Sequence, residues 1–195
     1  DRNGVESFEG IVPPILQRLP VLHGSFYNQA FAVDDSVAYS VFELDPAIFR
    51  WRHGTSKADR IEFPKRLRRG VATSDFDEMV RNPAKAAELA YNHSLPMQMT
   101  FASPWLLAIA MYDVDVVGQS FVGRYFVSYV DLREGRICPD LPVPVPTDPP
   151  ARITFSADTI IAIQQMLNAA GKPTTAIRRF WFNGAGCAWQ PLALP

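Results

Sequence analysis

One short stretch of the sequence has the residue types of a serine nucleophile. Residues 118–123 read Gly-Gln-Ser-Phe-Val-Gly and follow a valine-rich run. Hydrolases place a reactive serine on a sharp turn between a strand and a helix, with the spacing Gly-x-Ser-x-Gly. Here Gly123 comes three positions after Ser120, and residues 124–130 alternate like a strand. We therefore expect a turn between two strands, and keep a serine-type hydrolase that uses Ser120 as an alternative.

That alternative also needs a histidine base, and the chain has three histidines: His23, His53 and His93. We place each in a loop or at a helix end, where catalytic and ordinary surface histidines both occur. Asp113 and Asp115 are the acids that could orient one of them. Because the spacing of the serine motif is wrong, an enzyme is the weaker hypothesis.

Neither a metal nor a cofactor is expected. No pair of histidines, or of glutamate and histidine, has the spacing of metal ligands along the chain. Residues 184–186, Gly-Ala-Gly, are at most a fragment of a dinucleotide-binding motif and lie between two expected strands. We interpret them as a hairpin turn.

The distribution of charge is the most unusual feature. The stretch from Arg50 to Arg69 holds eight basic residues against only Asp59 and Glu62, whereas residues 1–49 have a balance of −5. The basic stretch either docks an acidic surface or pairs with the acidic N-terminal part of the same fold. The binding residues that we expect are Arg50, Trp51, Arg52, Lys57, Arg60, Lys65, Arg66, Arg68 and Arg69.

From these features we expect a non-catalytic binding or accessory protein, adaptor-like or inhibitor-like, that contacts another protein with an acidic face. Nucleic acid is a second alternative, ranked lower because only Trp51 and Phe63 are interleaved with the cations. The overall net charge of −1 also removes long-range attraction to phosphates. The oligomeric state is not predicted.

Composition places the chain among ordinary globular proteins. It has 195 residues, of which 48% are hydrophobic and 20% charged, enough for a full core in a single domain covering residues 1–195. Its apolar runs are too interrupted to cross a bilayer as a helix, so we expect no integral membrane segment and a soluble protein. The chain begins at Asp1, which suggests that a native N-terminus has been removed. No compartment is predicted.

The elements that would position these residues suggest an α/β or α+β fold, with a mixed sheet and helices packed on it. Asp34 to Ser36 predict a hairpin turn, and Val37, Tyr39 and Val41 one face of its second strand. Asp45-Pro46 predicts a helix over 47–52, and residues 56–93 a helical layer. Residues 94–131 form the core: both ends alternate like strands, while 104–111 fit a helix after Ser103-Pro104 or a strand buried on both faces.

The C-terminal third predicts a proline-rich surface strap at 139–150 and then a strand–helix–strand–hairpin unit. Ile160, Ile163 and Leu167 recur at helical spacing after a short strand at 152–155, and a second strand follows at 177–182. Residues 187–192 would return beside that second strand. The two cysteines, Cys138 and Cys187, are either joined in one disulfide or buried as free thiols.

Overall fold

The computed structural model describes residues 29–34, 36–43, 45, 47–63, 78, 81, 82, 84, 94–117 and 120–194. Within these ranges the chain consists almost entirely of β-strands, turns and irregular segments, and only Glu78, Arg81 and Ala84 have helical backbone. No helix among the described residues is long and apolar enough to cross a membrane. The strands are β1 (Gln29–Asp34), β2 (Val37–Phe42), β3 (Ala47–Arg52), β4 (Asp59–Glu62), β5 (Leu95–Ser103), β6 (Leu106–Val117), β7 (Ser120–Asp131), β8 (Arg136–Val143), β9 (Ala151–Ser156), β10 (Thr159–Leu167), β11 (Pro173–Trp181) and β12 (Gln190–Pro191).

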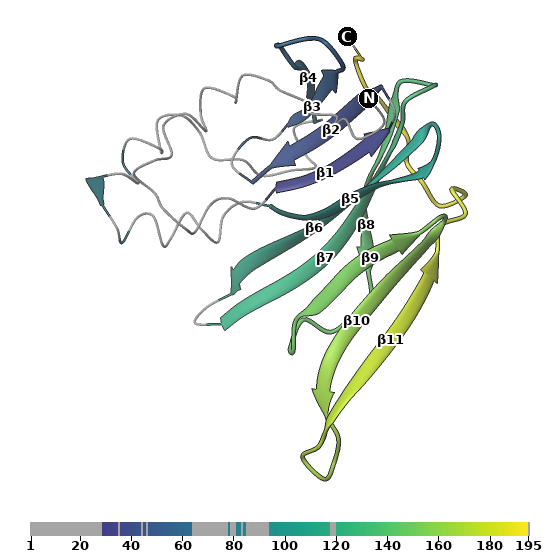
Figure 1. Cartoon of the computed structure of the whole chain (residues 1–195). Coiled ribbons are helices and arrows are strands. Elements are labelled where there is room, and N and C mark those ends of the chain that lie inside the picture. The colour runs from purple at the N-terminus through teal and green to yellow at the C-terminus, as the bar shows by residue number, and fades with distance from the viewer. Residues whose placement is uncertain are drawn as a thin grey trace, which may run out of the picture.

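The strands form three antiparallel sheets (Figure 1). Strands β1–β4 make a four-stranded sheet, and β5–β8 with β12 make a five-stranded middle sheet. Strands β9–β11 make a three-stranded C-terminal sheet in the order β11-β10-β9. Apart from β12, neighbouring strands in each sheet follow one another in the sequence, so each sheet is a meander joined by hairpins or short connections.

The middle sheet is covered on both faces. On β6, Leu107, Ile109 and Met111 pack with residues of β1–β4, whereas Ala108 and Ala110 face the opposite way and pack with residues of β9 and β10. A strand buried on both sides has no polar face and reads as a continuous apolar run. This explains the run at 94–131, and of our two interpretations of 104–111 the doubly buried strand is confirmed.

The prediction of an α/β or α+β fold is wrong. Residues 47–52, expected as a helix, form β3, and Ser103 with Pro104 belongs to the tight turn that joins β5 to β6. Within the proposed helical layer, residues 59–62 form β4 instead, whereas Glu78, Arg81 and Ala84 do have helical backbone. Most other residues of the layer lie outside the described part of the chain. Proline after a capping residue starts a turn as readily as a helix, and here pairing with neighbouring strands decided the outcome.

The C-terminal helix is also an error, because residues 159–167 form β10 between β9 and β11. Ile160 belongs to the core, but Ile163 and Leu167 lie on the other face, so their helical spacing was a coincidence. The apolar pattern of the sequence also predicts one core shared by Ile160, Ile163, Leu167, Phe180 and Phe182 with Phe101, Val127 and Tyr129. This prediction holds only in part: Phe180 and Phe182 do pack with Val127 and Tyr129. Phe101 lies on the opposite face of the middle sheet.

The predicted strap is partly strand. Residues 139–143, including Pro139 and Pro142, are the second half of β8, which pairs with β7. Beyond Ile137, β8 has no described strand on its other side, and prolines are tolerated on such an edge because no neighbour needs their missing N–H. Residues 144–150 do cross the surface irregularly, and Gln164 Nε2 donates hydrogen bonds to the carbonyls of Pro146 and Pro149, each at 2.8 Å.

The end of the chain returns to the middle sheet. Residues 187–192 do not pair with β11; instead β12 pairs with β8 through Ile137 and Arg136. Cys138 of β8 and Cys187 form a disulfide with a Cα–Cα distance of 5.6 Å, which the sequence had left open. The hairpin expected at 34–36 is confirmed, since Asp34 pairs with Val37.

Candidate functional site

The outer face of the C-terminal sheet is the part of the described surface best suited to bind another molecule. Its inner face packs on the middle sheet, and no described element covers the other face (Figure 1). Backbone pairing aligns the outward residues in three rows across the strands. The rows are Ser156–Thr159–Trp181, Thr154–Ile161–Arg179 and Arg152–Ile163–Ile177.

Large apolar side chains on this face are exposed. Ile177 is 61% exposed and Trp181 71%, and Leu167 at the far end of β10 is 70% exposed. Ile161 and Ile163 between them are half-buried. Single exposed apolar residues are common on proteins, but a contiguous group rimmed by polar residues marks an interaction site. The face therefore has an apolar centre that water solvates poorly.

The charge on this sheet has one sign. Strands β9, β10 and β11 contain no aspartate or glutamate, and Arg152 and Arg179 lie on the outer face at its opposite lateral edges. Arg178 points to the inner face, where it donates a hydrogen bond to Gln164 Oε1. The nearest carboxylate along the chain is Asp158, in the turn between β9 and β10. The apolar centre is thus flanked by cations without opposing charge on the strands themselves.

Strand β11 is also an edge of its sheet. Its only strand partner among the described residues is β10, so its other side presents backbone N–H and C=O groups along nine residues. Such an edge is a template on which an extended segment of another chain can pair. Pro173 at its start and the consecutive residues Arg178 and Arg179 restrict which strands fit there.

Two contacts position this sheet against the rest of the molecule. The backbone N–H of Ala151, at the start of β9, donates a buried hydrogen bond of 2.7 Å to the hydroxyl of Tyr125 on β7. Gln164 connects β10 to residues 144–150, as described above, and is itself buried. Because these bonds hold the inner face, the outer face is presented by a fixed support.

The basic stretch that the sequence indicated is partly neutralised within the first sheet. Arg50 pairs with Asp59 at 2.9 Å, and Arg52 reaches the same carboxylate at 3.2 Å. Arg60 pairs with Asp45 at 2.7 Å and also contacts Glu62. The partner Asp45 comes from the acidic N-terminal part, which is the intramolecular pairing that we had set against docking.

The other residues of that stretch are divided. Trp51 is half-buried and donates its indole N–H to Ser40 Oγ at 2.7 Å, whereas Lys57 is exposed in the β3–β4 connection. Lys65, Arg66, Arg68 and Arg69 lie outside the described residues. Docking of an acidic protein through this stretch therefore stays a prediction.

The residues of the hydrolase alternative are not brought together where the structure describes them. Ser120 opens β7 and pairs with Val117, so a strand and not a helix follows it, as expected; its side chain is outside the described part. His53 lies in the connection between β3 and β4 of the first sheet, whereas Ser120 begins a strand of the middle sheet. His23 and His93 are outside the described residues. Asp113 pairs across the ladder with Arg124.

One carboxyl group in the middle sheet has unusual acidity. Burial, and to a lesser extent the charge of Asp113, raises the pKa of Asp140 to about 7, against hydrogen bonds from the Ser128 hydroxyl and the Asp140 backbone that lower it. Ser128 Oγ lies 3.4 Å from the Asp140 carboxylate and accepts the Asp140 backbone N–H at 3.2 Å. Acidity near neutral pH is common at catalytic sites, but Ser128 is fully buried, so we assign this pair to the core.

No group of three or more metal-ligating side chains occurs in the part of the chain that the structure describes. The outer face of the C-terminal sheet was missed because residues 159–167 were interpreted as a helix. A signal was present: Arg152 to Trp181 contains arginines and isoleucines with a single carboxylate, Asp158. If alternate residues of this stretch are assigned to opposite faces of a sheet, the stretch predicts a sheet face that is apolar and cationic.

The sequence matches no protein-family model, and no curated protein or solved structure matches it either. The surface and its chemistry therefore carry the functional argument.

Proposed function

We propose that the protein is a non-catalytic binding protein that docks a partner protein on its C-terminal sheet. The partner presents an extended segment that pairs with the edge of β11 on which no described strand lies, and it carries alternating apolar and acidic side chains. The observation that carries the proposal is the exposed apolar face of β10 and β11, flanked by arginines on strands without a carboxylate.

The size of the face supports docking of a segment together with a surface. Strands β10 and β11 are nine residues long, and with β9 the face covers roughly 400 Å² by strand dimensions. A stable protein complex buries about 800 Å² on each partner. A partner that uses both the outer face and the edge of β11 comes closer to that area than one that uses the face alone.

The charges favour an acidic partner over a second copy of this chain. A strand added beside β11 places its side chains opposite Ile177, Arg179 and Trp181, and cross-strand pairs of opposite charge are stabilising. A second β11 would bring the arginines of both copies to one edge, where like charges repel. Backbone hydrogen bonds would give affinity in this mode, and the side-chain pairs would give specificity.

The test is a selection from a phage-displayed library of random peptides against the wild-type protein. We expect enriched peptides in which Asp or Glu alternates with apolar residues. Synthetic peptides from the selection should bind at least about tenfold more weakly to the Arg179→Glu and Ile177→Asp variants. The matched control is Trp105→Ala, which removes an exposed tryptophan from a different surface and should leave binding unchanged.

Several results would overturn the proposal. The face would have no role in binding if the enriched peptides lacked acidic residues, or if they bound both variants with the affinity of the wild type. A selection that enriches no peptide would have the same meaning. Concentration-dependent dimers in sedimentation that disappear in Ile177→Asp would assign the face to a second copy. Binding to phosphatidylserine vesicles that the same change abolishes would assign it to a membrane surface.

A further inference from the structure

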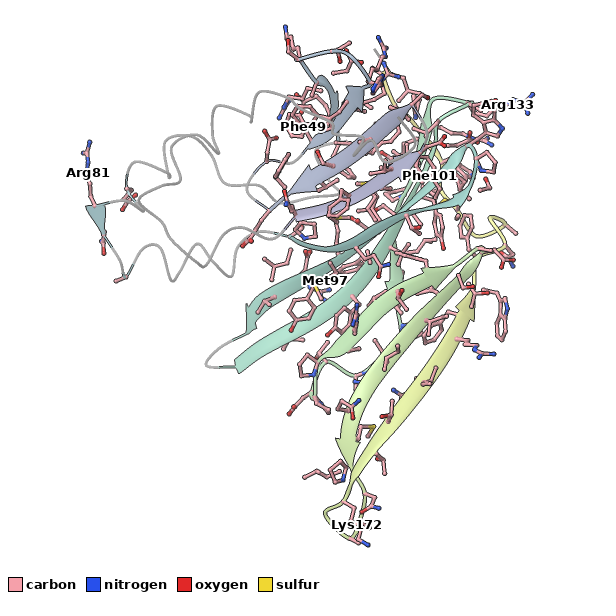
Figure 2. All side chains as sticks on the ribbon, viewed as in Figure 1. Phe49, Arg81, Met97, Phe101, Arg133 and Lys172 are labelled. Atoms are coloured by element: carbon pink, nitrogen blue, oxygen red, sulfur yellow. A yellow bond between two sulfur atoms is a disulfide. The ribbon has the colours of Figure 1, made fainter. Side chains whose placement is uncertain are left out.

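A pocket of about 360 Å³ opens at another place, where the β5–β6 and β7–β8 hairpins meet the segment that follows β11. Its walls include three aromatic side chains, Trp105, Phe182 and Trp189. The volume lies at the lower end of the range for pockets that bind small molecules. Figure 2 shows Arg133, another lining residue, at this end of the molecule, while Lys172 marks the opposite tip of the C-terminal sheet.

The aromatic walls are held in place by the surrounding structure. Phe182 stacks on buried Tyr129 with 3.7 Å between ring centroids, and it meets Trp189 edge to face at 6.5 Å. Trp189 comes two residues after Cys187, whose disulfide ties this segment to β8. On the other side, the carbonyl of Trp105 accepts the backbone N–H of Leu132 at 2.8 Å, which joins the two hairpin tips.

The charged residues of the pocket balance one another. Asp131 accepts hydrogen bonds from Arg136 Nε at 3.1 Å and from the backbone N–H groups of Arg133 and Glu134. The guanidinium of Arg136 also lies over the Trp189 ring, 4.6 Å from its centroid. Arg133 and Glu134 are exposed at the rim. Two arginines therefore face one aspartate and one glutamate, and the pocket has no net charge.

This combination selects a particular class of ligand. A charged ligand gains little from a neutral pocket, and a purely apolar ligand would bury charged groups without giving them partners. A sugar ring has an apolar C–H face that can stack on tryptophan and hydroxyl groups that both donate and accept hydrogen bonds. We propose that this pocket binds a sugar ring of a neutral carbohydrate. The proposal is independent of docking at the C-terminal sheet, because none of the residues that line this pocket belongs to the outer face of that sheet.

The test uses a glycan microarray and titrations of tryptophan fluorescence with the methyl glycosides of glucose, galactose, mannose and N-acetylglucosamine. We expect at least one neutral glycan to bind and to change the emission. Trp105→Ala should reduce that affinity at least about tenfold. The matched control is Trp181→Ala, which removes another exposed tryptophan, on the C-terminal sheet, and should bind as the wild type does.

A second variant, Glu134→Gln, tests the polar part of the pocket without removing an aromatic wall. It should weaken binding while leaving the melting temperature unchanged, because Glu134 is exposed. Absence of binding to every glycan and methyl glycoside would overturn the proposal. So would equal binding by the wild type and Trp105→Ala, or binding of adenosine monophosphate or of a simple carboxylate in preference to every sugar.

Discussion

Two tyrosines on one strand allow a sharp test of how the C-terminal sheet is attached. Tyr125 and Tyr129 lie on the same face of β7, and both are buried. The hydroxyl of Tyr125 accepts the Ala151 N–H at 2.7 Å, whereas the Tyr129 hydroxyl has no hydrogen-bond partner in the described part of the chain. Burial raises the pKa of both phenols, so both are neutral at physiological pH. The same change, tyrosine to phenylalanine, should therefore have opposite effects.

Tyr125→Phe leaves a buried backbone N–H without an acceptor, which costs about 1–3 kcal/mol of unfolding free energy. The ring itself stays, so its contact with Tyr112, at 4.8 Å between centroids, should survive. Tyr129→Phe removes a buried hydroxyl that makes no bond, and its stacking on Phe182 is retained. We expect that variant to be between unchanged and about 1 kcal/mol more stable than the wild type.

The assay is equilibrium unfolding in urea, followed by tryptophan fluorescence, with the slope of the transition compared among the three proteins. If the three proteins have equal slopes, a shift in the urea concentration at the midpoint reports a change in the free energy of unfolding. Hydrogen exchange at the Ala151 amide gives a second readout, since its protection should fall in Tyr125→Phe alone. Equal losses of stability in both variants, or no loss in Tyr125→Phe, would refute the assignment of this hydrogen bond as an anchor of the sheet.

Three further predictions concern other parts of the core. Because the pKa of Asp140 is raised in the folded protein, the unfolded chain binds fewer protons between about pH 4 and pH 7, and stability falls as pH rises through this window. Asp140→Asn should therefore raise the melting temperature at about pH 8 and leave it unchanged at about pH 4; the same shift at both values would contradict the raised pKa. Reducing the disulfide between Cys138 and Cys187, which are 49 positions apart, should cost about 4 kcal/mol by loop entropy, and mass analysis with and without reductant checks the bond itself. Gly123→Ala should cost about 1–3 kcal/mol because a new Cβ would overlap the Tyr112 ring, and the cost should fall in a Tyr112→Ala background; equal costs in both backgrounds would show that the overlap is not the cause.

Local signals in the sequence were sufficient for several elements. The turn residues at 34–36 and the alternation of Val37, Tyr39 and Val41 gave the first hairpin with its buried face correctly. The alternation of Tyr125, Val127 and Tyr129 likewise gave β7. In these segments one face is more polar than the other, or a turn fixes the register, so period two is visible without knowledge of the neighbours.

The sequence showed where charged residues are concentrated but not which of them form ion pairs. The basic stretch from Arg50 was visible in the sequence. Its pairing with Asp59 depends on the antiparallel pairing of β3 with β4, and its pairing with Asp45 depends on the position of the β2–β3 connection beside β4. Composition reports how many charges a segment has, and only the fold decides which of them meet. The same holds for Cys138 and Cys187, whose bond requires β8 and the last segment of the chain to lie side by side.

The choice between helix and strand in the C-terminal third was made by tertiary structure. Residues 159–167 contain apolar side chains at positions that fit both periods, and no local signal separates them. Pairing with β9 and β11, and packing of Ile160 and Ala162 on the middle sheet, selected the strand. That selection turns Ile161 and Ile163 to the outer face, which no described element covers. The sequence determined that this segment is apolar and without acid, and the stacking of three sheets decided that half of those apolar side chains face outward.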